Sequence, residues 1–269
     1  MKKIFNLVSS PRSGSTIIYN ALCSNDIFNP ALPESHFASD LSHLYYKQLL
    51  RKADIEKNYI YKTNKDIKLY FQQCIKIFYD NLLKKYSVDN LIIKSMKLTP
   101  NMNVLYDFFP GGNYIMIVRD PRDIISSMLR VGKKQKDENI EPHFPYNLSL
   151  LCNKINISYR LYLEPKFEDF VSKKIHTIKY EDFVTDPLKQ LNIFSVKFFN
   201  KKLYKNTENI WERSKDVYAS NNKKAYQSEL WGHNITTKKI NEYKNTLRDN
   251  EINEISKYCK KYMNYFSYS

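Results

Sequence analysis

The first 22 residues constrain the fold more strongly than any other part of this chain. An apolar run at residues 4–9 leads into Pro11-Arg12-Ser13-Gly14-Ser15-Thr16, after which apolar residues recur at helical spacing at Ile17, Ile18, Ala21 and Leu22. A buried strand that turns through small residues directly into a helix is typical of α/β proteins. Because the N-terminal amides and the dipole of such a helix attract anions, the segment predicts an anion-binding turn.

The residues of the turn define what kind of anion it can hold. Gly14 lets the backbone approach a ligand closely, Ser15 and Thr16 offer hydroxyl donors, and Arg12 offers a fixed cation. The Gly-Lys-Ser/Thr ending of a Walker A loop is absent. An ordinary serine-rich turn between a strand and a helix is the alternative that this motif alone leaves open.

The rest of the chain alternates between strands and helices, which predicts an α/β fold with a central parallel sheet flanked by helices. Expected strands lie at residues 4–9, 91–94, 114–118 and 175–180, and expected helices at 17–22, 40–52, 66–86, 120–129, 147–172 and 187–199. We expect one domain over residues 1–269, with a lid or loop region at 201–248 and a terminal helix at 249–263. Ligands of such folds bind at the carboxyl ends of the strands.

A second anion-binding motif follows the third expected strand. Arg119 ends the strand, Asp120 and Pro121 begin a helix, and Ser127 lies eight residues after the arginine. The guanidinium and the hydroxyl are therefore expected to hold one phosphate together. The alternative is that Arg119 pairs with a nearby acid and Ser127 is a small packing residue.

Taken together, the two motifs resemble those of a known family. Residues 11–16 resemble the 5′-phosphosulfate loop of sulfotransferases that use 3′-phosphoadenosine-5′-phosphosulfate (PAPS), and Arg119 to Ser127 resembles their 3′-phosphate motif. Lys179-Tyr180-Glu181-Asp182-Phe183 is similar to a third signature of the family. The resemblance spans about residues 4–190, with the motifs in the family's order.

The resemblance implies a P-loop-like α/β fold, PAPS as the donor, 3′-phosphoadenosine 5′-phosphate (PAP) as the product and no metal. It implies that residues 12–16 (Arg12, Ser13, Gly14, Ser15 and Thr16) hold the 5′-phosphosulfate, and that Arg119 and Ser127 hold the 3′-phosphate. Tyr180 is expected at the adenosine or in the core. The Arg-Lys-Gly-x-x-Gly stretch of the small-molecule cytosolic group is absent, so the likeness is to the bacterial, tyrosylprotein and carbohydrate types.

Sulfuryl transfer to a hydroxyl requires a base and cations near the leaving group. Glu34 lies 22 residues after Arg12, close to where tyrosylprotein-type and several bacterial and carbohydrate enzymes of the family carry a catalytic glutamate. His36 is the alternative base in the same loop. Lys94, at the end of the second expected strand, is the candidate cation beside Arg12, although Met96 stands where the family often has a proline.

Two further segments give weaker expectations. The charged, proline-containing stretch 133–145 is expected to be a mobile excursion over the surface. Trp231 and Gly232, with the preceding Lys223 and Lys224, are expected to form a late lid over the 3′-phosphate or the adenine, and a buried structural tryptophan is an equally supported alternative.

Composition narrows the partners. The formal net charge of +15 suits an anionic ligand, but the lysines are dispersed and form no basic helix or zinc module, which disfavours a nucleic-acid-binding protein. A small-molecule kinase of the P-loop type is disfavoured by the missing Walker lysine. Four scattered cysteines indicate reduced thiols and a cytoplasmic location, and no segment is apolar enough to span a membrane. The acceptor is expected to bear a hydroxyl, with a carbohydrate as the first candidate, and no pattern indicates an oligomeric state.

Overall fold

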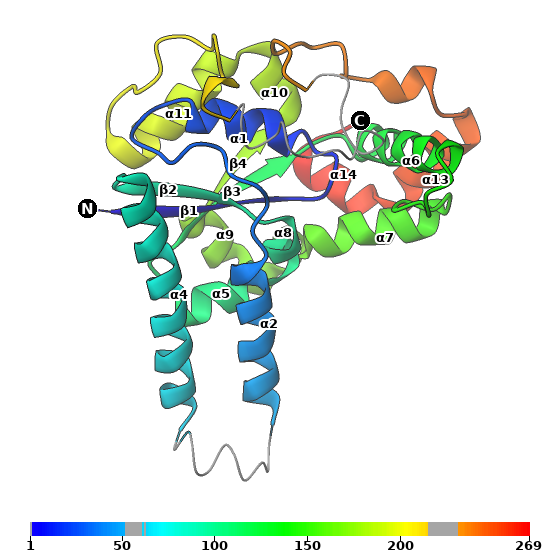
Figure 1. Ribbon diagram of the computed structural model, residues 1–269. Helices are drawn as coiled ribbons and strands as arrows, with labels where there is room; N and C mark the ends of the chain where they lie inside the picture. The colour runs from blue at the N-terminus through cyan, green and yellow to red at the C-terminus, as the bar shows by residue number, and fades with distance from the viewer. Residues whose placement is uncertain (1, 52–60, 62, 215–230) are drawn as a thin grey trace.

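A four-stranded parallel sheet forms the centre of the chain (Figure 1). The computed structural model describes residues 2–51, 61, 63–214 and 231–269. The strands are β1 (Lys3–Ser9), β2 (Asn90–Lys94), β3 (Asn113–Val118) and β4 (Ile175–Lys179), in the order β2-β1-β3-β4. All three neighbouring pairs are parallel, so the four carboxyl ends meet at one edge. This confirms the predicted fold class.

Helices cover both faces of the sheet (Figure 1). One face is covered by α1 (Ser15–Cys23), α10 (Tyr180–Thr185) and α11 (Pro187–Phe199). The opposite face is covered by a larger set: α5 (Met102–Phe108), α6 (Pro121–Asp137), α7 (Leu148–Ser158), α8 (Arg160–Leu163), α9 (Glu168–Lys174), α13 (Asp249–Tyr258) and α14 (Lys260–Phe266). Short 3-10 turns lie at Met96–Asn101, Pro165–Phe167, Glu212–Ser214 and Glu242–Asn245.

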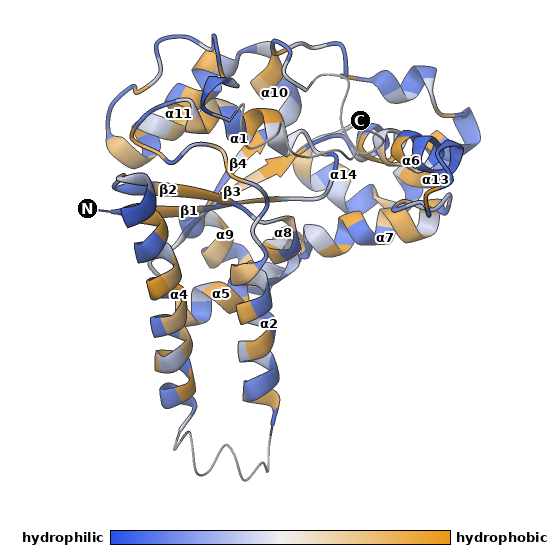
Figure 2. Cartoon of the chain, viewed as in Figure 1, coloured by the Kyte–Doolittle hydropathy of each residue, from blue (hydrophilic) through white to orange (hydrophobic). Residues whose placement is uncertain are grey.

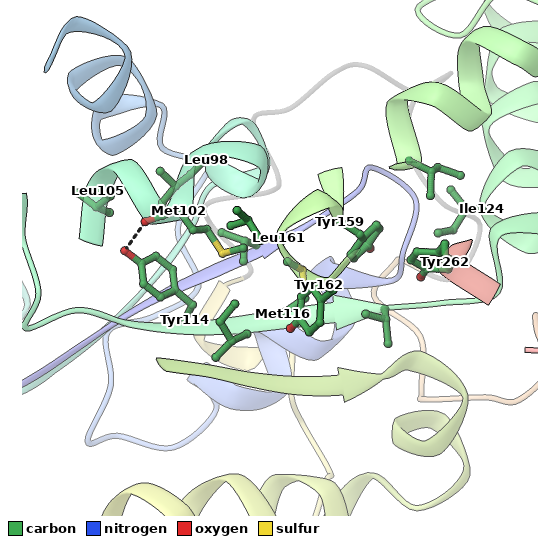
Figure 3. Packing of buried hydrophobic residues seen from close by; sticks show 14 of the residues in the cluster. Leu98, Met102, Leu105, Tyr114, Met116, Ile124, Tyr159, Leu161, Tyr162 and Tyr262 are labelled. Atoms are coloured by element: carbon green, nitrogen blue, oxygen red, sulfur yellow. Dashed lines mark hydrogen bonds between the residues drawn. The ribbon is translucent and has the colours of Figure 1, made fainter. Parts of the chain in front are cut away.

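Side chains of each strand alternate between the two cores, as the period of two of a β-strand requires. In β3, Tyr114 and Met116 point into the larger core, whereas Ile115 and Ile117 point into the smaller one. Figure 3 shows the larger core, in which the Tyr114 hydroxyl donates to the carbonyl of Met102 at 3.0 Å. Burial on both faces explains why these strands are continuous apolar runs in the sequence.

Two long helices, α2 (Phe37–Leu50) and α4 (Asn64–Tyr86), run side by side away from the sheet as an arm (Figure 1). Their facing sides pack where they join the domain, with the Tyr45 and Phe71 rings 5.3 Å apart. Helix α4 begins with a capping box, in which Thr63 and Asp66 each accept the other's backbone N–H.

The expectation of a mobile excursion at 133–145 is wrong for its first part, because α6 continues to Asp137. The cause is packing on one side of the helix. Val131 and Gln135 are buried, and the Gln135 side chain accepts the His143 backbone N–H at 2.9 Å. A methyl group on Gly132 would lie 2.2 Å from the Phe144 carbonyl oxygen, so the returning chain lies directly on the helix.

The single helix expected at 147–172 is also wrong, because the segment divides into α7, α8, a 3-10 turn and α9. Pro165 cannot donate the backbone hydrogen bond that a continuous helix needs at that point. The expected terminal helix likewise divides at Cys259 into α13 and α14. Within the described residues, no helix has the length and apolar character needed to cross a membrane.

Candidate functional site

The turn after β1 has an unusual backbone. Arg12 and Gly14 both adopt left-handed conformations, with φ of 68° and 83°, and α1 begins at Ser15. Alternating left-handed residues in a turn curve the chain so that successive N–H groups point toward a common point. The first turn of α1 adds amides that have no partner within the helix. The turn therefore provides a concave, positively polarised backbone surface.

Tyr180, the first residue of α10, lies directly against this turn. A methyl group on Gly14 would lie only 2.3 Å from the Tyr180 Cδ2 atom, so the ring occupies the space that any other residue's side chain would need. The Arg119 guanidinium carbon lies 4.4 Å from the centre of the same ring. Burial is the main cause of the raised pKa of Tyr180, so its hydroxyl is neutral near neutral pH. The ring thus joins the turn after β1 to the residue after β3.

Arg119 is held in place by several protein groups. Its Nη1 donates to the Arg12 carbonyl at 3.2 Å, its Nη2 donates to the Lys239 carbonyl at 2.5 Å, and Nη2 lies 3.7 Å from the Asp123 carboxylate. The Asp123 carboxylate also accepts the backbone N–H groups of Asn241 and Tyr243, each at 2.9 Å. The pairing of Arg119 with a nearby acid, an alternative from the sequence, is therefore present. The buried Nε has no hydrogen-bond partner within the described residues.

Ser127 and Arg12 meet although they lie on different elements. The Arg12 Nε donates to the Ser127 Oγ at 3.1 Å, which joins the turn after β1 to α6. The neighbouring Ser126 points elsewhere and shares a hydrogen bond of 2.6 Å with the Thr246 hydroxyl. The two sequence motifs thus form one site, and Arg12 belongs to both halves.

Lys94, at the carboxyl end of β2, reaches the same turn. Its Nζ donates to the Thr16 Oγ1 at 3.0 Å. Burial lowers the pKa of Lys94, the neighbouring Glu34 carboxylate opposes that shift, and the Arg12 charge adds to it. A second cation thus lies at the helix end of the turn.

Glu34 is fixed by the segment that follows β2. Its Oε1 accepts the Met96 backbone N–H at 2.8 Å, and the neighbouring Ser35 N–H donates to the Lys94 carbonyl at 2.9 Å. His36 lies close by, with its Nδ1 3.9 Å from the Glu34 Oε1. Both side chains remain accessible to solvent, so either can reach a bound acceptor.

Ser13 has a different environment from the other residues of the turn. Its hydroxyl is buried, donates to the Ser10 carbonyl at 2.9 Å and lies 3.2 Å from the Tyr159 hydroxyl. Its side chain therefore supports the turn from inside, and only its backbone faces the concave side. Ser15 makes a weak contact of 3.6 Å with the Met96 sulfur, so the residue that replaces the family's proline packs on the turn.

Sequence reasoning missed two residues that support the site. The Tyr159 hydroxyl donates to the Ile117 carbonyl at 2.7 Å and accepts the Ser10 N–H at 3.2 Å, fixing both ends of the turn's approach (Figure 3). Glu181 accepts the Asp120 backbone N–H at 2.9 Å where α6 begins, and burial raises its pKa. Tyr159 lies in the middle of an apolar helical stretch, where no local pattern distinguishes it, whereas Glu181 lies within a family signature.

The late segment contacts the site only in part. The Lys239 carbonyl binds Arg119, as described above, and the Trp211 Nε1 donates to the His233 carbonyl at 2.8 Å. The rings of Trp211 and Trp231 lie 6.4 Å apart. Lys223 and Lys224, expected in the lid, lie outside the described residues.

Comparison with known proteins adds independent evidence. A family model described as the sulfotransferase family matches residues 5–193, which is more than half of the chain. No protein with a curated function matches the sequence at a significant level.

Several solved structures share the fold. The sulfotransferase domain from the curacin biosynthetic pathway aligns with a TM-score of 0.58 and 20% identity, covering 97% of this chain and 98% of that one. The sulfotransferase domain from the Synechococcus PCC 7002 olefin synthase aligns with a TM-score of 0.59 and 18% identity, covering 96% and 95%. The sulfotransferase STF9 from Mycobacterium avium aligns with a TM-score of 0.51 and 12% identity, covering 100% and 78%.

Proposed function

This chain belongs to the sulfotransferase family, as a PAPS-dependent enzyme, and we propose that its donor lies across the residues that join the turn after β1 to α6. The contact between the Arg12 Nε and the Ser127 Oγ carries this proposal. A single side chain reaches both motifs, so an anion bound at either motif lies within reach of Arg12. A nucleotide with phosphoryl groups at both its 5′ and 3′ positions matches such a pair of neighbouring anion sites.

In this proposal the 5′-phosphosulfate lies on the concave backbone of residues 12–16, with Lys94 and Arg12 as cations. The 3′-phosphate lies at Arg119 and Ser127. The buried Arg119 Nε, which has no partner among the described residues, supports a ligand there, because a buried donor without an acceptor is costly. Tyr180 packs between the two positions and offers a ring face near the nucleoside.

The chemistry we propose is a direct, in-line transfer. The acceptor oxygen forms a bond to sulfur while the bond from sulfur to the 5′-phosphate oxygen breaks, and Glu34 takes the proton that the acceptor hydroxyl loses. Lys94 and Arg12 stabilise the negative charge that develops on the departing phosphate oxygen. Contacts of Lys94 with Thr16, and of Glu34 with the Met96 amide, support this arrangement because they place the base and the cation at adjoining strand ends. These protein cations need no metal ion beside them.

The acceptor remains a hydroxyl-bearing molecule, with a carbohydrate as the first candidate. Glu34 opens to solvent beside the root of the α2–α4 arm, so an acceptor approaches from that side. His36 is the competing base, because its ring lies near the same carboxylate.

Nucleotide binding tests the proposal directly. Isothermal titration of the purified chain with PAP should give one site, and ATP with Mg²⁺ should bind at least tenfold more weakly. Tighter binding of ATP with Mg²⁺ would favour the kinase alternative. Salt-sensitive binding of duplex DNA without binding of PAP would favour the nucleic-acid alternative. Labelled PAPS and a panel of carbohydrate, tyrosyl and small-metabolite hydroxyls would then identify the acceptor.

A further inference from the structure

The far end of the α2–α4 arm carries large apolar side chains that no described residue covers. Five of them, each at least 46% exposed, form what we call the arm end: Leu44, Tyr46, Leu50, Leu69 and Tyr70. They lie on the second half of α2 and the second turn of α4, away from the sheet (Figures 1 and 2). Apolar side chains concentrated at one protruding end of a protein generally mark an interaction surface.

These side chains surround the arm and do not share one flat face. In α2, Tyr45 points inward and is 2% exposed, so Leu44 and Tyr46 project toward opposite flanks. In α4, Ile67 and Phe71 point inward, so Leu69 projects outward, on the far side from Ile67. A rigid partner that docked on one side would leave the other sides exposed, whereas a fluid apolar medium would cover them all.

Positive charge accompanies the apolar residues. The described residues 44–51 and 63–70 contain four cations, Lys47, Arg51, Lys65 and Lys68, and one acid, Asp66. That acid is used by the capping box of α4, where it accepts the Thr63 N–H at 2.7 Å. Lysine and arginine stems can lie along an apolar surface while their charges reach the polar headgroups above it.

We propose that the arm end is a peripheral membrane anchor that inserts into the headgroup region of an anionic lipid bilayer. Tyrosine and leucine side chains around the arm enter the interface, and the adjacent cations bind anionic headgroups. Tyrosine suits this position because its ring is apolar and its hydroxyl remains hydrated.

A second copy of the chain is a poorer occupant. Two arm ends in contact would bring four cations on each side together, and the net charge of +15 on each chain would oppose the approach further. The protruding shape also offers no concave surface in which a protein helix could lie. The bilayer satisfies the charge and the all-round apolar exposure at once.

The geometry keeps the active site out of the lipid. Glu34 precedes α2 by three residues, and the 14-residue helix separates it from the arm end by about 20 Å. An enzyme anchored in this way would present Glu34 to acceptors held above the headgroups. The anchor does not depend on the proposed residue roles, since it uses none of the residues that we assign to the donor or to catalysis.

Vesicle sedimentation of the full chain tests the anchor. With vesicles of phosphatidylcholine and phosphatidylglycerol (7:3) in 0.1 M salt, we expect the chain to sediment with the lipid, and at least tenfold less with phosphatidylcholine alone. Raising the salt to 0.5 M should release it, because salt screens headgroup attraction. No binding to the anionic vesicles, or equal binding to both compositions, would overturn the proposal.

A matched pair of triple variants separates the arm end from general surface hydrophobicity. Leu44→Ser, Leu50→Ser and Leu69→Ser together should lower partitioning at least tenfold. Ile157→Ser, Ile193→Ser and Val196→Ser, at residues of similar exposure on α7 and α11, should leave it within twofold. Equal losses would contradict the proposal, as would a monomer–dimer equilibrium that sedimentation velocity shows to depend on the arm-end residues. Unchanged PAP titration in both variants confirms that each is folded, and failure of the donor assignment would appear only in that titration.

Discussion

The Arg12 Nε atom and the Ser127 Oγ atom lie 3.1 Å apart, although 115 positions separate the two residues in the sequence. This hydrogen bond crosses from the turn after β1 to the second turn of α6. It places a side chain of the 5′ half of the proposed donor site against a side chain of the 3′ half.

Ser127→Ala should weaken PAP binding ten- to a hundredfold, because a hydrogen bond to a charged group contributes about 1.5–3 kcal/mol. Binding of adenosine 5′-monophosphate, which lacks the 3′-phosphate, should change less than threefold. Titration of both nucleotides measures the difference. Ser126→Ala is the matched control, since that hydroxyl bonds to Thr246, and it should leave the ratio of the two affinities unchanged.

Glu34→Gln should lower kcat by a factor of about 10² to 10⁴ and leave the affinity for PAP intact, because the amide keeps the shape of the side chain and cannot accept the proton. His36→Gln is the paired variant and should retain most of the turnover. Single-turnover transfer from labelled PAPS measures both. If the histidine variant lost the activity and the glutamine at 34 did not, His36 would be the base.

Lys94 should make PAP affinity fall at alkaline pH. Burial holds its pKa below the ordinary value of 10.5, so the ammonium loses its proton, and with it the attraction for phosphate, at a lower pH than an exposed lysine would. Affinity should therefore decline as the pH rises from 7.5 to 10. Lys94→Arg, whose side chain stays charged, should remove the decline, whereas Lys94→Ala should give weak binding at every pH. A decline that persists unchanged in the arginine variant would assign it to another group.

Gly14→Ala should damage both stability and donor binding. A left-handed conformation costs a non-glycine residue about 1–2 kcal/mol, and the new methyl group would overlap the Tyr180 ring at 2.3 Å. We expect a lower unfolding midpoint in urea and at least tenfold weaker PAP binding. Gly111→Ala, where no atom lies within 4 Å of the added carbon, is the control and should alter neither quantity.

His176 should make the fold sensitive to mild acid. Burial, helped by the Lys197 charge, lowers its pKa from 6.5 to about 4, so the folded state favours the neutral ring. Stability is complete above pH 6.5 and is lost as the pH falls toward 4, because the unfolded chain takes up the proton first. Between pH 7 and 5 the loss should be about 2 kcal/mol.

His176→Phe should remove this loss, since the ring lies between Phe194 and Phe198 in the smaller core. Urea unfolding at pH 7 and pH 5 measures the effect. His43→Gln, at an exposed position on α2, should keep the acid sensitivity of the original chain. Equal sensitivity in the phenylalanine variant would show that other groups cause it.

The sheet was predictable because its signals are local. The four strands were expected within one residue of their observed ends, since strands buried on both faces are apolar runs bounded by polar residues. The helix start at Asp120 was equally clear from its cap and Pro121. Where α6 ends was not, because burial of Gln135 against the returning chain depends on contacts between segments that no local pattern encodes.

The same distinction applies to the site. Both anion motifs could be found from spacing, but the contact of Arg12 with Ser127 and the support from Tyr159 arise only when distant segments meet. The spacing of Arg119 and Ser127 suggested a pair acting on one phosphate. The fold instead places Arg12 at the serine and fastens Arg119 to the carbonyls of Arg12 and Lys239.

That last fastening uses main-chain oxygen at position 239, so it is indifferent to which amino acid stands there. Natural variation can replace Lys239 freely, provided that the chain length between Trp231 and Arg248 is kept. A one-residue insertion or deletion in that interval would move the carbonyl away from Arg119. Homologues should therefore vary in identity at this point and be uniform in spacing.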